Sequence, residues 1–179
     1  MLDKEDTIFV LVDVQGKLAR LMYQRDDLFS NLKILIQAMQ LLGVPILMME
    51  QTPHKLGPTI PELKELLPAV EPIRKNTFSC AGSPEFLDNL KLSGATNVVL
   101  AGIETHVCVY QTAIDLLTRG LGVHVVADAV SSRTESNRNL GLNRILAEGG
   151  RLTSTEMLLF EMQRRAEGDE FRALIKLVK

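Results

Sequence analysis

Three residues far apart in the sequence carry side chains that together suit nucleophilic chemistry: Asp13, Lys75 and Cys108. Cys108 lies at the start of a predicted helix, directly after the apolar run 98–103. The helix dipole and unpaired N–H groups at that place lower the pKa of a thiol toward the reactive thiolate. A cysteine nucleophile also needs a base for its proton and a cation that holds the thiolate and fixes the base. Asp13 and Lys75 supply both groups if the fold brings them to Cys108.

Each of these residues alone also has an ordinary structural interpretation. A single free cysteine is most often a small buried hydrophobic residue. Asp13 ends the apolar run 8–12, where a carboxylate is costly to bury without a partner, but it could also bind a backbone amide of its loop. A loop lysine such as Lys75 is most often a solvated charge. Cys80 follows no strand and starts no obvious helix, so it is the weaker candidate nucleophile.

Predicted strands and helices alternate along the chain, and this alternation predicts an α/β fold with a mostly parallel sheet that would position these residues. Apolar runs typical of strands buried on both faces lie at 8–12, 44–49, 98–103 and 123–127, with a further short strand at 151–153. Helical patterns cover 27–42, 83–94, 105–119, 136–148, 155–165 and 169–178, and irregular segments cover 51–59 and 68–82. Ligands of such sheets bind beyond the carboxyl ends of the strands, where Asp13 and Cys108 both fall.

Three segments resemble, in order and spacing, signatures of the isochorismatase-like cysteine hydrolases. They are LVDVQ at 11–15, KNTFS at 75–79 and AGIETHVCV at 101–109, within a resemblance that extends from about Asp6 to Thr155. The matching residues of that family form a catalytic triad, so the resemblance implies Asp13, Lys75 and Cys108 as the triad here. It also implies a three-layer α/β/α sandwich with a six-stranded, mostly parallel sheet in the order 3-2-1-4-5-6.

The resemblance carries expectations about the residues around the triad. It implies a cis peptide bond between Ile103 and Glu104, with the N–H groups of Glu104 and Cys108 forming an oxyanion hole. Gln15 and Phe78 are candidate substrate-binding residues, although Gln15 could instead hydrogen-bond its own loop and Phe78 could belong to the core. Thr105 either orients the Glu104 turn or caps the helix that carries Cys108.

No metal and no cofactor are expected. Nicotinamidases, one branch of the family, place an Asp-x-His…His metal site after the second strand. The segment 50–55 of this chain contains one histidine there, His54, without a partner, and the sequence has no CxxC pair. The segment is more similar to the isochorismatase domain-containing branch. His106 lies two residues before Cys108, so on a helix it would point away from the thiol.

Length and composition limit the partners. One domain over 1–179 is expected, with 46% hydrophobic and 23% charged residues and a net charge of -2. No basic run indicates nucleic acid, no apolar run is long enough for a membrane, and no secretory signal is visible, so a cytoplasmic protein is expected. A homo-oligomer is expected from the resemblance, with Leu174, Ile175, Leu177 and Val178 packing across an interface.

The leading functional hypothesis is a hydrolase that cleaves an amide-type C–N bond of a small molecule through a Cys108 thioester. One alternative is a vinyl-ether hydrolase of the isochorismatase type, although the intact cysteine argues against it. Another is a noncatalytic oligomeric scaffold that retains the triad. A depressed pKa of the Cys108 thiol would favour the nucleophile, and an ordinary thiol would favour the scaffold.

Overall fold

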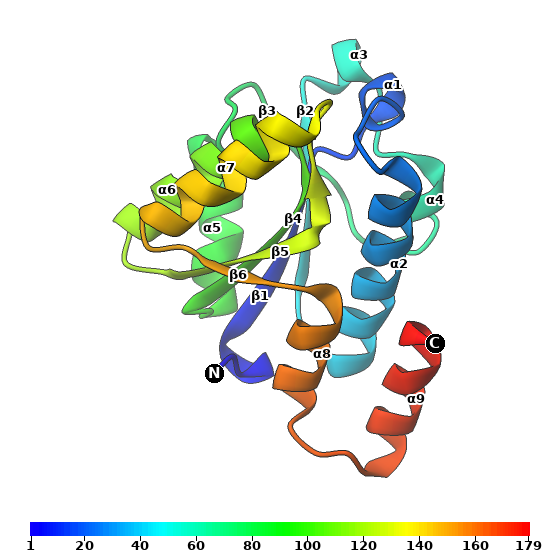
Figure 1. The fold of residues 1–179 in the computed structure, drawn as a ribbon. Helices are drawn as coiled ribbons and strands as arrows, with labels where there is room; N and C mark the ends of the chain where they lie inside the picture. The colour runs from blue at the N-terminus through cyan, green and yellow to red at the C-terminus, as the bar shows by residue number, and fades with distance from the viewer.

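A six-stranded sheet forms the centre of the computed structural model, which describes residues 1–179, and every neighbouring pair of strands is parallel. The strands are β1 (Thr7–Val12), β2 (Ile46–Gln51), β3 (Ile73–Lys75), β4 (Asn97–Ile103), β5 (Gly122–Ser131) and β6 (Arg151–Thr153). Their order across the sheet is β3-β2-β1-β4-β5-β6, as predicted (Figure 1). The chain therefore has the expected three-layer α/β/α architecture.

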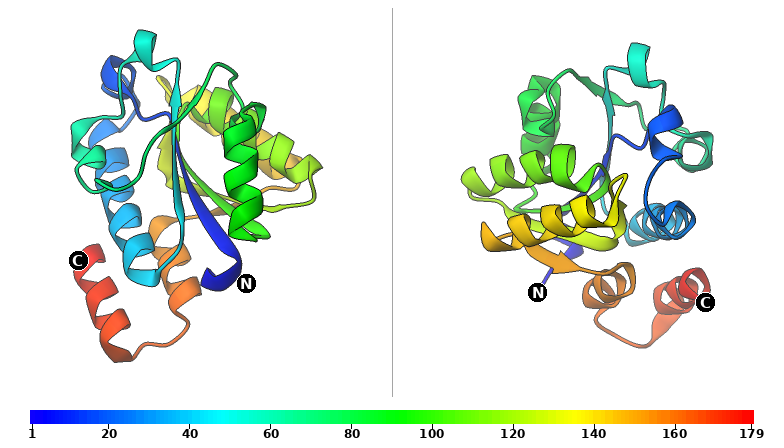
Figure 2. Two further views of the ribbon diagram at one scale, coloured as in Figure 1. Left: turned by 180° about the vertical axis from the view of Figure 1, so that it is seen from behind. Right: turned by 45° about the horizontal axis from the view of Figure 1, so that its top comes forward.

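Helices cover both faces of the sheet, as the two views of Figure 2 show. One face carries α2 (Arg25–Leu42), α8 (Thr155–Gln163) and α9 (Gly168–Val178), and the other carries α5 (Pro84–Ser93), α6 (Tyr110–Thr118) and α7 (Glu135–Ala147). The one-turn helices α1 (Gly16–Ala19), α3 (Pro53–Leu56) and α4 (Pro61–Lys64) lie in the connections that flank β2, and short 3₁₀ turns span Lys4–Asp6 and Cys80–Gly82. None of the helices is long and apolar enough to cross a membrane.

The continuous apolar character of the central strands follows from burial on both sides. Phe9 and Leu11 of β1 belong to the core under α2, whereas Ile8 and Val10 belong to the core under α5 and α6. Because successive side chains of a strand point to opposite faces, a strand between two helical layers needs apolar residues at every position.

Local signals in the sequence fix several helix ends. The helix α2 ends at Gly43, whose φ of 71° is the left-handed conformation that favours glycine. Ser83 caps α5, because its side chain accepts a hydrogen bond from the N–H of Phe86. Both ends are therefore confirmed as predicted.

The structure corrects the sequence prediction in three segments. The segment 68–82, predicted as irregular, contains β3, an edge strand too short to show a periodic pattern. The strand β5 extends to Ser131 rather than ending at residue 127. The predicted end was too early because the polar Asp128 interrupts the apolar run of this strand. The predicted helix 105–119 is a π-helical turn (Thr105–Val109) followed by α6.

The C-terminal helix α9 packs against its own chain. Leu174 is completely buried in the core that includes α2, and Leu177 and Val178 pack against the same core. The expectation of an interface contact is therefore wrong for Leu174, and it stays a prediction for the half-buried Ile175, Leu177 and Val178. An amphipathic helix at a chain terminus has the same sequence pattern whether it covers its own core or a partner.

Candidate active site

Asp13 follows the central strand β1 directly and lies at the middle of the carboxyl edge of the sheet. Its backbone has a φ of 50°, an unusual conformation for a residue with a side chain, and its N–H donates to the carbonyl oxygen of Met49 on β2. The side chain is 3% exposed. Unusual backbone conformations of this kind cluster at functional sites, where they aim a side chain.

Lys75, the last residue of β3, is fully buried and paired with Asp13. Its Nζ lies 2.6 Å from Asp13 Oδ2. The ammonium also donates to Gln51 Oε1 at 3.3 Å, to the carbonyl oxygen of Thr77 at 3.1 Å and to that of Phe78 at 2.9 Å. The three hydrogens of this ammonium thus face four acceptors, so Lys75 is a fixed internal cation rather than a solvated charge.

Cys108 lies in the π-helical turn after β4 and reaches the same place. Its Sγ donates a hydrogen bond of 3.1 Å to Gln51 Oε1, the oxygen that also accepts from Lys75. Asp13 Oδ1 accepts no hydrogen bond from the protein, and Asp13 and Cys108 line one cavity. The structure therefore brings Asp13, Lys75 and Cys108 together from three strand ends.

The protonation of the thiol differs from the expectation. Burial raises the pKa of the Cys108 thiol above its ordinary range, the Asp13 carboxylate raises it further, and Lys75 lowers it by less. Burial also raises the pKa of Asp13, against the lowering effect of Lys75. The predicted depression of the thiol pKa is therefore wrong, because desolvation and the adjacent carboxylate exceed the effect of the cation. Burial therefore favours the thiol form of Cys108 at this site.

The cavity at Cys108 has a volume of about 190 Å³ and mostly apolar walls. It is lined by Asp13, Leu18, Gln51, Leu56, Phe78, Ile103, Glu104, Val107 and Cys108. Phe78 is 51% exposed, so the interpretation of this residue as part of the core is wrong. Phe78 lines the cavity, which agrees with the other interpretation, that its ring contacts the apolar part of a ligand.

The backbone and side chain of Glu104 are held at the edge of this cavity. The Ile103–Glu104 peptide bond is cis, as expected, and no loop or cap hydrogen bond uses the Glu104 N–H. Glu104 Oε1 accepts hydrogen bonds of 3.1 Å from both the backbone N–H and the Nε of Arg133. Glu104 precedes the π-helical turn, and Thr105 does not cap it, since its buried Oγ1 has no partner.

Tight packing supports the turn that carries Cys108. A Cβ atom at Gly141 of α7 would lie 2.9 Å from the backbone of His106, so α7 contacts this turn directly. His106 points away from the thiol, and its Nδ1 lies 2.9 Å from Ser132 Oγ after β5. A Cβ atom at Gly102, whose φ is 120°, would lie 2.2 Å from the carbonyl oxygen of Val12. Glycine thus allows β4 to approach the end of β1 closely.

Two glutamines complete the arrangement. Gln15 is fully buried; its Nε2 donates to the carbonyl oxygens of Gln51 and Gly57, and its Oε1 accepts from the Gln51 N–H. These contacts match the loop role that the sequence left open for Gln15. Gln51, which binds both Lys75 and Cys108, was not singled out from the sequence. The only signal for it was its place at the end of β2.

Cys80, the weaker candidate nucleophile, and Asp128 of β5 both have structural contacts. Cys80 is completely buried and lines no part of the cavity, and burial raises its pKa to about 12. Asp128 Oδ1 accepts from the N–H and Oγ1 of Thr155 and so holds the start of α8. No cluster of three or more histidine, cysteine or carboxylate side chains is arranged for a metal ion.

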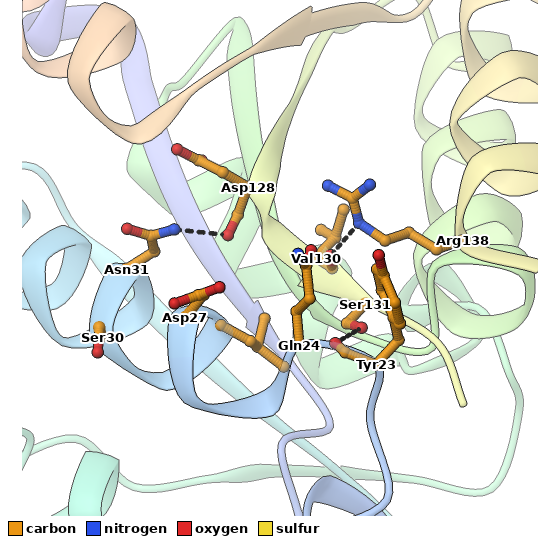
Figure 3. A pocket seen from close by; sticks show the side chains of 10 residues that line it. Tyr23, Gln24, Asp27, Ser30, Asn31, Asp128, Val130, Ser131 and Arg138 are labelled. Atoms are coloured by element: carbon orange, nitrogen blue, oxygen red, sulfur yellow. Dashed lines mark hydrogen bonds between the residues drawn. The ribbon is translucent and has the colours of Figure 1, made fainter. Parts of the chain in front are cut away.

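A second, polar cavity of about 300 Å³ lies between the start of α2, the end of β5 and α7 (Figure 3). Its lining includes Asp27, Asp128 and Arg138, and it shares no residue with the cavity at Cys108. The Ser131 hydroxyl donates to the carbonyl oxygen of Tyr23, and Asn31 donates to that of Asp128. Arg138 donates through Nε to the carbonyl oxygen of Val130. These contacts join α2 and α7 to β5.

Fold and site together define a class: α/β/α sandwich proteins with a buried cysteine, carboxylate and ammonium at the carboxyl edge of a parallel sheet. The isochorismatase domain profile matches residues 7–157. Isochorismatase domain-containing protein 2A of Mus musculus is 38% identical over 176 residues, which cover 98% of this chain and 84% of that protein. The chain belongs to the isochorismatase family and has its hydrolase fold.

Solved structures show the same architecture. The MAR1 ribonuclease of Caenorhabditis elegans superposes with a TM-score of 0.91 at 36% identity, covering 99% of this chain and 91% of that one. YcaC of Pseudomonas aeruginosa, solved with hexane-2,5-diol and covalent acrylamide, has a TM-score of 0.92 at 26% identity and covers 98% and 90%. YcaC of Escherichia coli, an octameric hydrolase of unknown specificity, gives 0.92 at 26% and covers 98% and 89%.

Proposed function

We propose that this protein is a cysteine-dependent hydrolase that cleaves an amide-type C–N bond of a small molecule through a Cys108 thioester. The observation that carries the proposal is the convergence of the Cys108 thiol, the Asp13 carboxylate and the Lys75 ammonium beside one cavity. A nucleophile, its base and a group that fixes the base are the parts that such catalysis requires.

In the first step, Asp13 takes the thiol proton while the sulfur attacks the carbonyl carbon. The raised pKa of the Cys108 thiol means that a free thiolate is scarce, so proton transfer accompanies attack. Asp13 Oδ1 is the acceptor in this step, since Oδ2 is bound to Lys75 and Oδ1 has no partner. Lys75 stays protonated and holds Asp13 in place.

The negative charge then forms on the carbonyl oxygen, which accepts from the N–H groups of Glu104 and Cys108. One such donor typically contributes about 10²–10³ in rate. The C–N bond breaks as Asp13 returns its proton to the leaving nitrogen. Water then attacks the thioester carbon and gives a proton to Asp13, the S–C bond breaks, and the thiol is restored with release of a carboxylic acid.

The raised pKa of the Cys108 thiol by itself favours the noncatalytic scaffold, but two other considerations support an active thiol. YcaC of P. aeruginosa, whose fold is shared, is described with covalent acrylamide, which agrees with a reactive group in this architecture. A noncatalytic scaffold gives no reason for a buried carboxylate–ammonium pair, because such a pair adds little net stability compared with apolar residues of similar volume. The vinyl-ether alternative remains an outcome of the substrate screen below.

The test compares Cys108→Ala with Cys80→Ala as the matched control. Small amides and carbamoyl compounds are screened for ammonia release, a small vinyl ether is screened for its carbonyl product, and covalent adducts are followed by mass spectrometry. Cys108→Ala loses turnover and adduct formation with an unchanged circular dichroism spectrum, and Cys80→Ala retains both. Full activity of Cys108→Ala would refute the proposal. Turnover of a vinyl ether but of no amide would favour the isochorismatase alternative.

We also propose that the chain is a single domain over residues 1–179 that forms a homo-oligomer in the cytoplasm and needs no metal or cofactor. The octameric E. coli YcaC supports self-association. The proposed steps use only side chains, backbone N–H groups and water. Light scattering after size exclusion measures the assembly, and a mass equal to one chain would contradict it. Turnover unchanged by a chelator is expected, and a loss restored by one metal would refute metal independence.

A further inference from the structure

We propose that the cavity beside Cys108 selects small uncharged molecules with a short apolar group and N–H donors next to the reacting carbon, and that it excludes carboxylates and phosphates. The inference deepens the proposed function, because it concerns the substrate class of the same site. It depends on the walls, the size and the charges of the cavity.

The walls and size favour a short apolar group. Five of the lining side chains, Leu18, Leu56, Phe78, Ile103 and Val107, are hydrophobic. The volume of about 190 Å³ corresponds to about six water-sized groups. A ligand of that size places its apolar part against these five walls and its carbonyl at Cys108.

The open side-chain oxygens at the cavity are acceptors, whereas the Glu104 N–H is an open backbone donor. Asp13 Oδ1 has no hydrogen-bond partner. Glu104 Oε1 is bound by Arg133, which leaves Oε2 without a partner in the chain. The buried Asp13 Oδ1 gains from an N–H donor, because an unsatisfied buried polar group costs its desolvation energy, and Glu104 Oε2 offers a second, accessible acceptor. A primary amide or carbamoyl group provides such donors.

No cation lines the cavity to receive an anion. Lys75 Nζ already faces four acceptors and its side chain is 0% exposed. Arg133 binds Glu104 through Nε and is not among the lining residues. A carboxylate inside the cavity would therefore meet Asp13 and Glu104 directly, and like charges at short range in a poorly solvated site repel strongly. A dicarboxylate such as isochorismate meets the same obstacle.

The test uses two alkylating reagents that differ in charge but hardly in size: iodoacetamide and iodoacetate. In each reaction the sulfur of Cys108 bonds to the methylene carbon, iodide leaves, and the thiol proton goes to Asp13 or solvent. Rates are measured by mass spectrometry on the Cys80→Ala protein, with 2-mercaptoethanol as the reference thiol and Cys108→Ala as the blank. The readout does not require turnover, so it is independent of the hydrolase proposal.

We expect Cys108 to prefer iodoacetamide over iodoacetate by about tenfold or more beyond the preference of the reference thiol. Glu104→Gln keeps a hydrogen-bonding side chain for Arg133 and lowers this ratio. Glu148→Gln removes an exposed carboxylate on the outer end of α7 and leaves the ratio unchanged. The ratio of the Cys80→Ala protein alone decides the inference if Glu104→Gln does not fold.

An iodoacetate rate equal to or above that of iodoacetamide, after correction by the reference thiol, would overturn the inference even if amides are hydrolysed. Failure of both reagents to label Cys108 would also overturn it, because the cavity would then be closed to molecules of this size. A charge preference without turnover of any amide would leave the selection in place and refute the hydrolase proposal.

Discussion

Replacing Lys75 by methionine should destabilise the protein strongly, because it leaves the Asp13 carboxylate buried without its partner. The Nζ–Oδ2 distance is 2.6 Å, and the side chains of Lys75 and Asp13 are 0% and 3% exposed. Breaking a buried pair by removing one partner typically costs about 3–5 kcal/mol. Methionine has a similar length and fills the same space, so the loss reflects charge and hydrogen bonding rather than a cavity.

The dependence of this loss on pH follows from the direction of the Asp13 pKa. Burial already raises it above the ordinary value of 3.8, and Lys75 is the main group that lowers it. Without Lys75, the pKa of folded Asp13 rises further. Between the unfolded and folded pKa values, the folded state binds more protons, so the free energy of unfolding falls as pH rises, by at most about 1.4 kcal/mol per pH unit. The deficit of Lys75→Met is therefore largest at neutral pH and shrinks as pH falls.

Urea denaturation of the wild type and the variant at several pH values between 4 and 8 measures this deficit. The double variant Asp13→Asn/Lys75→Met removes both charges and should recover most of the lost stability. Lys4→Met is the matched control: Lys4 forms a half-exposed pair with Glu170, so it should cost at most about 1 kcal/mol without the same pH trend. A Lys75→Met loss below about 1 kcal/mol that does not vary with pH would refute the assignment of a charged, coupled pair.

Three further predictions concern turnover. Asp13→Asn should lower kcat/KM by about 10²–10⁴ in an ammonia-release assay, because asparagine tolerates the left-handed backbone but is not a base; a smaller loss would contradict the role of Asp13. Since burial raises the pKa of Asp13, the acidic limb of kcat/KM against pH should lie above the ordinary carboxylate range, and a limb within that range would argue against this base. Gly141→Ala should lower both Tm and kcat, because its Cβ would lie 2.9 Å from the His106 backbone, whereas exposed Leu140→Ala should change neither; equal effects would contradict this support.

The apolar patterns predicted a mostly parallel α/β fold with Asp13 and Cys108 at strand ends, and the family resemblance supplied the strand order and the triad. The buried strands β1 and β4 have unbroken apolar patterns, and Asp13 and Cys108 follow them directly. The position of Lys75 was less accessible, since β3 has only three residues and its place at the edge of the sheet came from the resemblance. A three-residue edge strand carries no periodicity that separates it from a loop.

The properties that depend on three-dimensional surroundings could not be predicted. The sequence position of Cys108 suggested a lowered pKa from a helix start, but burial and the nearby Asp13 determine the opposite direction. Gln51 was missed for a similar reason. A glutamine at a strand end has many uses, and only the contacts of its Oε1 with both Lys75 and Cys108 distinguish this one.

The hydrogen bond from the thiol to Gln51 also bears on how the proposed nucleophile is controlled. Gln51 Oε1 faces two donors, Lys75 Nζ and Cys108 Sγ, and turning its amide would place an NH₂ group against the ammonium. The lysine thereby fixes an acceptor toward the sulfur, which stabilises the thiol over the thiolate. Lys75 thus acts on the sulfur in two opposite ways, as an attractive charge and through the amide that it orients. In the proposed reaction the thiol proton, which is hydrogen-bonded to Gln51 Oε1, moves to Asp13 Oδ1, and we expect a substrate carbonyl at the Glu104 N–H to make this transfer more favourable.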